Sequence, residues 1–200
     1  GYLRSQLDQR QGPVLGEYDD TESQVVYEHL KWSRQANIGL WVTSWRGPTH
    51  PIDSTIRNVI LPHPKLGDHK IALLYEIGTR MSEHDSWDTS RVAIDLEYIC
   101  DFYFSESNYF RVRGRPVLFL SLTRKLYSVG VLERVTVLMR TIAEAFGHDV
   151  YLVGDQIWNA APTEEIYMPF LLLDAVTKLD ISGNMISPGL AGQEAVDDYY

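Results

Sequence analysis

The stretch HKIALLYEIG, residues 69–78, reads as a buried strand that ends on an acid. Every residue from 71 to 77 is apolar or aromatic except Glu76. A strand that is apolar on both faces is typical of a parallel sheet covered by helices. Side chains alternate along a strand, so if Leu74 faces away from the helices, Glu76 does too, and Tyr75 faces the helix layer. An acid in that position is either a surface charge or part of a functional site.

The sequence on either side of this stretch alternates strand-like and helix-like patterns. Strands are expected at 38–45, 70–76, 115–123, 149–156 and 171–180, and helices at 19–36, 53–61, 88–104, 131–147 and 191–200. Asp53 or Ser54 is expected to cap the second of these helices. Buried strands separated by helices predict an α/β fold with one parallel sheet.

Two architectures fit this alternation, a doubly wound open sheet and a (β/α)8 TIM barrel. The glycine-rich phosphate turn of a dinucleotide-binding fold follows none of the strands. Several strands instead end on polar residues, and TIM-barrel enzymes carry their chemistry at the carboxyl ends of their strands. We therefore expect a barrel. A complete barrel has eight strands and about 250 residues, so a partial barrel of about five to six β/α units is expected, as a single, incomplete domain over residues 1–200.

Composition and charge argue against several classes of protein. The chain of 200 residues is 44% hydrophobic and 22% charged, which is typical of one globular domain and not of a disordered chain. Its net charge of −9 and the lack of a run of Lys or Arg argue against binding to nucleic acid. No apolar stretch reaches the roughly 18 residues of a membrane span. Cys100 is the single cysteine and lies in an apolar segment, so a buried thiol is expected.

Polar and aromatic side chains follow the ends of the predicted strands. Because the carboxyl ends of parallel strands meet at one edge of a sheet, these residues are expected to form an open site. Six of them are candidate substrate-binding residues: Trp45, Glu76, Arg124, Asp155, Gln156 and Asp180. Two alternatives stay open. Trp45 could belong to the core, and Glu76 could form a structural ion pair with Arg46 or Arg124.

The residue types at these positions favour chemistry on glycosidic bonds. In that chemistry one acid protonates the leaving oxygen and a second carboxylate assists at the anomeric carbon. The six His show no HxH or HExxH spacing, so no metal site is predicted. No Gly-x-Ser-x-Gly turn indicates a serine nucleophile. No cofactor is expected.

Four segments, taken in order, resemble glycoside hydrolase family 99. They are GEYDDTESQVVYEHLKWSRQANIGLWVTSW (16–45), KIALLYE (70–76), YFRVRGRPVLFLSLTR (109–124) and DVYLVGDQ (149–156). The resemblance implies a (β/α)8 barrel and an endo-acting, retaining, α-mannosidase-like hydrolase that needs no metal. It also implies a mannose-containing or related glycan as the partner. On the resemblance alone, a secreted protein or one in the endomembrane lumen is favoured.

Single positions carry over from the family's pattern. Trp45 matches its aromatic turn, and Glu76 matches the strand-end acid that lines the substrate cleft. Arg115 and Pro116 match a Gly-Arg-Pro segment that is expected to be structural. Arg46 departs from the pattern, because the family commonly has a second aromatic residue there.

The family's catalytic pair, two Glu in a Glu-Trp-x-Glu segment, does not occur in this chain. The chain starts at Gly1 rather than Met and stops at Tyr200 within a predicted helix. We therefore expect the catalytic pair beyond residue 200 and the family's first strand before Gly1, and no catalytic residue is assigned within the chain. The alternative to an enzyme is a glycan-binding paralogue without activity.

Overall fold

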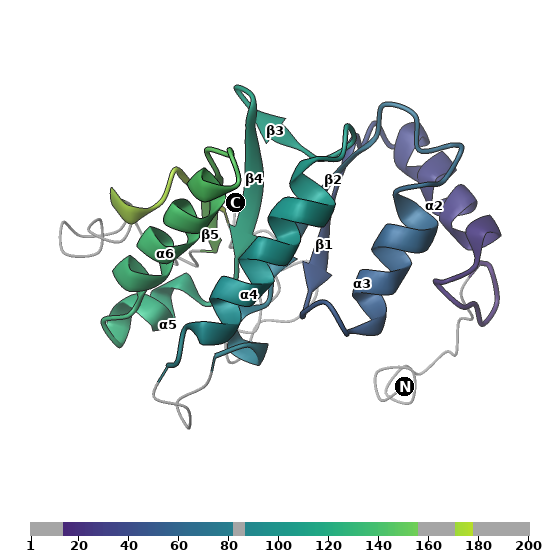
Figure 1. Cartoon of the computed structure of the whole chain (residues 1–200). Coiled ribbons are helices and arrows are strands. Elements are labelled where there is room, and N and C mark those ends of the chain that lie inside the picture. Colours follow the sequence, from purple (N-terminus) through teal and green to yellow (C-terminus); the bar gives the residue numbers. More distant parts are fainter. Residues whose placement is uncertain (1–13, 82–86, 156–170, 178–200) are drawn as a thin grey trace, which may run out of the picture.

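The computed structural model of the chain describes residues 14–81, 87–155 and 171–177, and its main feature is a parallel sheet (Figure 1). The parallel strands lie in the order β1 (Leu40–Trp45), β2 (Lys70–Tyr75), β4 (Arg115–Leu120), β5 (Tyr151–Asp155) and β6 (Ala175–Thr177). A short strand, β3 (Arg111–Val112), pairs antiparallel with the start of β4. The parallel strands follow chain order without a reversal, which confirms the barrel type over the doubly wound sheet. Among the described residues the sheet stays open at β1 and β6, as expected of a partial barrel.

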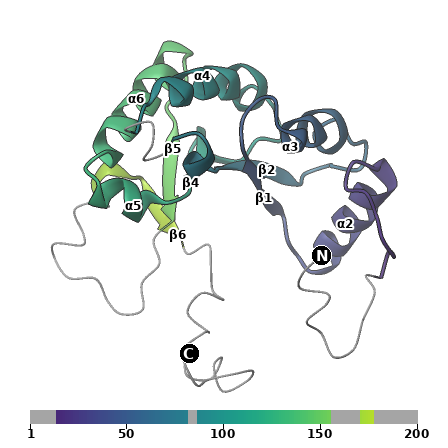
Figure 2. The same cartoon turned by 90° about the horizontal axis from the view of Figure 1, so that it is seen from below.

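Four helices form an arc along one face of the sheet (Figure 2). They are α2 (Ser23–Gln35), α3 (Pro51–Thr55), α4 (Ser90–Ile99) and α6 (Leu132–Ala145). Two of them continue as wider, π-type turns, α3 into η1 (Ile56–Ile60) and α4 into η4 (Cys100–Phe104). The short helices η2 (Ile77–Thr79) and α5 (Thr123–Ser128) follow β2 and β4. None of the helices in the described part of the chain is long and apolar enough to cross a membrane.

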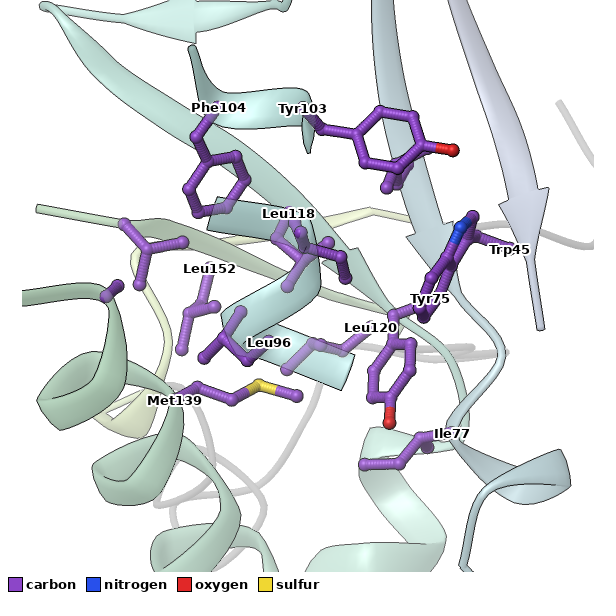
Figure 3. Packing of buried hydrophobic residues seen from close by; sticks show 14 of the residues in the cluster. Trp45, Tyr75, Ile77, Leu96, Tyr103, Phe104, Leu118, Leu120, Met139 and Leu152 are labelled. Carbon is purple, nitrogen blue, oxygen red and sulfur yellow. The ribbon is translucent and has the colours of Figure 1, made fainter. Parts of the chain in front are cut away.

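The hydrophobic core lies between the sheet and these helices (Figure 3). Alternate residues of the strands point into it, among them Tyr75 of β2, Leu120 of β4 and Leu152 of β5. The helices contribute apolar residues one turn apart, such as Val135 and Met139 of α6. Each fully buried apolar side chain stabilises the fold by roughly 1.5–3 kcal/mol. Because these side chains face the helices, the alternate side chains of each strand point away from the helices.

Most of the predicted elements are confirmed, with shifted ends. The helices predicted at 53–61 and 88–104 are α3 with η1 and α4 with η4. The strand predicted at 115–123 is β4, which ends earlier because a left-handed turn and α5 follow it. Of the strand predicted at 171–180, residues 175–177 form β6, residues 171–174 are not strand, and residues 178–180 lie outside the described residues. The helix predicted at 191–200 lies outside them.

The start of the second helix corrects the prediction of its cap. The helix begins at Pro51, a favourable first residue because it lacks an N–H that would have no partner there. The imidazole of His50 caps the helix by accepting a hydrogen bond from the N–H of Ile52 at 3.3 Å. Asp53 and Ser54 lie inside the helix and are not its caps.

Candidate functional site

The carboxyl ends of the strands carry polar side chains on the face opposite the helices. The register pairs Trp45 with Tyr75 and Tyr75 with Leu120, and all three belong to the helix-side core. Their neighbours Ser44 and Glu76 therefore point to the opposite face. We use the term strand-end surface for the residues Ser44, Glu76, Leu122 and Asp155 at this edge.

Glu76 is half-buried on the strand-end surface. Its carboxylate accepts a hydrogen bond from the hydroxyl of Ser44 at 2.9 Å. Its N–H donates to the carbonyl of Trp45 at 2.9 Å, which extends the pairing of β1 and β2 by one step. Within residues 14–81, 87–155 and 171–177, Glu76 forms no ion pair with Arg46, Arg124 or another cation. An ionised carboxylate can accept about four hydrogen bonds, so Glu76 keeps acceptor capacity for a ligand.

The backbone on both sides of Glu76 is held by neighbouring groups. The hydroxyl of Ser121 accepts the N–H of Ile77 at 3.1 Å and donates to the carbonyl of Tyr75 at 3.2 Å. The carbonyl of Glu76 accepts both the N–H and the hydroxyl of Thr79, at 2.9 and 2.8 Å. The carboxylate therefore stands on a backbone whose position is set before any ligand arrives.

A partly buried ion pair joins the turn after β2 to α4. Asp95 of α4 is fully buried and accepts two hydrogen bonds from Arg80, at 2.6 and 2.9 Å, and one from the hydroxyl of Tyr75 at 2.8 Å. The guanidinium of Arg80 lies on Gly47 in the turn after β1, where an added Cβ would be 2.8 Å from Cζ. Hydrogen bonding to Asp95 raises the pKa of Arg80, and burial together with the charge of Asp95 raises the pKa of Tyr75. Both groups therefore stay protonated donors at neutral pH.

Asp155 is the last residue of β5 and lies on the other side of β4 from Glu76. Its carboxylate accepts the N–H of Thr123 at 3.0 Å, and its carbonyl accepts the hydroxyl of the same residue. Beside it is a hollow of about 350 Å³, lined by Leu122, Arg124, Lys125, Ser128 and Asp155. Arg124 was predicted at a strand end; it belongs to α5 and lines the same hollow as Asp155.

The position predicted for Trp45 needs correction, because its ring lies in the core and not on the strand-end surface (Figure 3). The ring is fully buried and packs against Tyr75 with 5.8 Å between the ring centroids. The indole N–H donates to the carboxylate of Asp53 at 2.7 Å. Alternation along β1 gives the open face to Ser44, so no face of the Trp45 ring is exposed for a sugar to stack on.

Asp53 is the centre of a buried cluster with a structural role. Besides Trp45, the hydroxyls of Tyr98 and Tyr103 donate to its carboxylate. These two tyrosines are five residues apart, which is the hydrogen-bond spacing of a π-type turn such as η4. Arg57 donates to the hydroxyl of Tyr98 at 2.6 Å. The cluster ties β1, α3 and α4 together through hydrogen bonds that satisfy a buried acid.

The remaining residues singled out in the sequence lie elsewhere. Gln156 and Asp180 are outside the described residues. Arg115 forms ion pairs with Asp149 at 3.0 Å and Asp174 at 2.7 Å at the amino ends of the strands, far along the sheet from the strand-end surface. Burial would raise the pKa of Asp174, but the N–H of Leu152 and the two guanidiniums beside it outweigh burial and lower that pKa. No group of His, Cys, Asp and Glu in the described part is arranged to hold a metal ion.

Three residues of the site were missed from the sequence, namely Ser44, Ser121 and Leu122. Ser44 precedes Trp45 and so occupies the opposite face of β1, but alternation alone does not tell which of the two residues faces the site. Ser121 lies inside the strand predicted at 115–123 and carries no charge that would single it out. Leu122 has φ 58° and ψ 25°, and nothing about a leucine in an apolar run predicts that left-handed conformation.

No protein-family model and no curated protein matches the chain. Its structure is similar to that of the GH99 endo-alpha-mannosidase from Bacteroides thetaiotaomicron in complex with BIS-TRIS-propane, with a TM-score of 0.58, 18% identity, and coverage of 84% of this chain and 50% of that chain. A second structure of that enzyme gives a TM-score of 0.55, 17% identity and coverage of 88% and 49%. The structure of a glycoside hydrolase-like protein gives a TM-score of 0.55, 18% identity, and coverage of 76% of this chain and 49% of that chain.

These similarities concern the fold. The chain spans about half the length of the structures it resembles, 49 to 50% of each. Together with the sequential parallel strands, they show a (β/α) barrel fold like that of these structures, and the open sheet is consistent with a partial barrel.

Proposed function

We propose that this chain is part of a glycoside hydrolase that binds a glycan on the strand-end surface. The observation that carries the proposal is Glu76, a half-buried acid at the carboxyl end of a barrel strand, oriented by Ser44 and free of any ion pair among the described residues. Ionised carboxylates accept strong hydrogen bonds from hydroxyl groups, and a sugar ring presents several of these. The fold shared with glycoside hydrolase structures supports a carbohydrate as the partner.

Glu76 and Asp155 bind substrate in this proposal and do not form the catalytic pair. They belong to the ends of β2 and β5, and β4 lies between these strands. The carboxylate of Asp155 is engaged by the N–H of Thr123 at 3.0 Å. Neither residue lies in a Glu-Trp-x-Glu segment, which the resemblance implies for the catalytic pair.

The finer assignment is an endo-acting, retaining, metal-independent, α-mannosidase-like reaction on a mannose-containing glycan. We infer that the catalytic pair of Glu belongs to the part of the barrel beyond residue 200, and that the present chain supplies the other part of a single domain. Arg124, Gln156 and Asp180 are further substrate-binding residues in this proposal. The half-length coverage of the GH99 structures supports this division of the barrel.

Turnover of a defined glycan tests the enzyme assignment. The full-length protein is incubated with α-mannan oligosaccharides labelled at the reducing end, and the products are separated by chromatography. We expect internal cleavage, with the α-anomer as the first product in NMR because the reaction retains configuration. The 200-residue chain alone should release nothing, because it lacks the catalytic pair. Turnover by this chain alone would contradict the assignment.

A glycan-binding protein without activity is the second candidate, favoured by the absence of a Glu-Trp-x-Glu segment from these 200 residues. It would use the same strand-end surface. Binding of the oligosaccharides by a full-length protein that releases no products, and whose sequence lacks the two Glu, would decide for it.

A further inference from the structure

Leu122 has a backbone conformation that its side chain does not favour. It lies between β4 and α5 with φ 58° and ψ 25°, the left-handed region that glycine and asparagine adopt far more readily. The residue is 46% exposed, so burial offsets only part of that strain. An exposed leucine alone needs no explanation. An exposed leucine held in a strained conformation does, because such residues gather at functional sites.

The residues on either side of Leu122 hold it in place. Before it, Ser121 bonds to the backbone of Tyr75 and Ile77, around Glu76. After it, Thr123 bonds to Asp155 through its N–H and its hydroxyl. The strained residue is therefore fixed to both neighbouring strand ends, β2 and β5.

The side chain of Leu122 reaches across the strand-end surface. Its Cδ1 would be only 2.6 Å from a Cβ added at position 78, so this close approach depends on Gly78. On its other side, Leu122 lines the hollow of about 350 Å³ beside Asp155. It thus presents an apolar group between the turn that carries Glu76 and the end of β5.

We propose that Leu122 is a ligand-contact residue that helps to select the sugar bound on this surface. Its methyl groups would pack against the apolar C–H face of one sugar ring, while Glu76 and Asp155 accept hydrogen bonds from hydroxyl groups at the ring's edges. Binding sites commonly combine apolar contact with a few fixed polar groups in this way. The inference rests on the proposed function. It adds that Leu122 provides the apolar contact that an aromatic ring would otherwise provide.

Titration calorimetry of the full-length protein with α-mannotetraose tests this role. Leu122→Asn relieves the backbone strain and removes the apolar contact. We expect affinity to fall about tenfold, with a melting temperature that is unchanged or higher. Val137→Asn, at a 56% exposed position on the outer side of α6, is the matched control and should bind like the wild type.

A second variant moves Leu122 without replacing it. The added methyl group in Gly78→Ala would lie 2.6 Å from Cδ1 and push the Leu122 side chain aside, so it should weaken binding in the wild type and add no loss in the Leu122→Asn protein. An equal loss in both backgrounds, or unchanged affinity of Leu122→Asn, overturns the role of Leu122. If Glu76→Gln still weakens binding in that case, the proposed function stands. A wild-type protein that binds no α-mannotetraose overturns both.

Discussion

Replacing Gly47 by alanine should destabilise the protein by separating the turn after β1 from Arg80. Gly47 has φ +116°, which residues with a side chain rarely adopt. The new Cβ would be 2.8 Å from Cζ and 2.9 Å from Nη1 of Arg80. The guanidinium cannot retreat without loosening its two hydrogen bonds to Asp95, which is fully buried.

The loss in the free energy of unfolding has two contributions, the positive φ and the weakened ion pair. Positive φ costs a residue with a side chain of order 1–3 kcal/mol. Removing the partner of a buried charge costs about 3–5 kcal/mol, and we take about half of that because Tyr75 continues to donate to Asp95. The sum is roughly 4 kcal/mol, which lowers the melting temperature of a chain this size by about 8–16 °C.

Urea and thermal unfolding followed by circular dichroism measure the effect. Gly114→Ala is the matched control, since Gly114 also has a positive φ, +82°, but nothing lies within 4 Å of an added Cβ. Gly114→Ala should lose only the part of the free energy of unfolding that the positive φ accounts for. Gly47→Ala should also cost much less in an Arg80→Ala background. Equal losses for the two glycine variants, or an undiminished loss in that background, would refute the part assigned to Arg80.

Three further predictions concern buried groups. Trp45→Phe removes one of three hydrogen-bond donors to Asp53 and should lower the free energy of unfolding by about 1.5–3 kcal/mol, while glycan affinity stays unchanged. A variant that lost glycan affinity but kept its full stability would show that Trp45 contacts the glycan. Burial, aided by the charge of Arg34, lowers the pKa of His69, so the unfolded chain binds the proton better and stability falls as the pH drops below about 6.5. His69→Gln should therefore lose less melting temperature than the wild type between about pH 7.5 and about pH 5.5, and equal losses would count against this linkage. Burial, first of all, raises the pKa of Cys100 to about 12, so its thiol should resist an aromatic disulfide reagent at mildly alkaline pH until urea unfolds the protein; rapid labelling of the folded chain would show that the thiol is accessible.

The fold could be predicted because its signals are local. The runs at 70–76 and 149–156 are apolar on both faces, and helix-like patterns between strands imply sequential parallel pairing. The end of β4 could not be predicted, because the left-handed turn at Leu122 has no sequence signal. The six residues of α5 are also too few to show a helical period.

The site could be predicted in part for a related reason. Alternation along β2 put Glu76 on the same face as Leu74, and the strand register and the core place that face opposite the helices. Alternation along β1 does not say which of Ser44 and Trp45 faces the helices, since that depends on the register with β2. The pairing of Arg80 with Asp95 depends on how α4 packs against the turn after β2, and no local pattern carries that.

The central claim is that Glu76 binds a glycan as an ionised acceptor on the strand-end surface, and calorimetric titration of its glutamine variant tests it most directly. In the full-length protein, Glu76→Gln keeps the shape and the hydrogen bond from Ser44 but removes the charge. We expect affinity for α-mannan oligosaccharides to fall about tenfold or more with little change in melting temperature, while Glu97→Gln, exposed on α4, binds like the wild type. Unchanged affinity of Glu76→Gln together with a clearly lower melting temperature would contradict the claim and make Glu76 a structural residue.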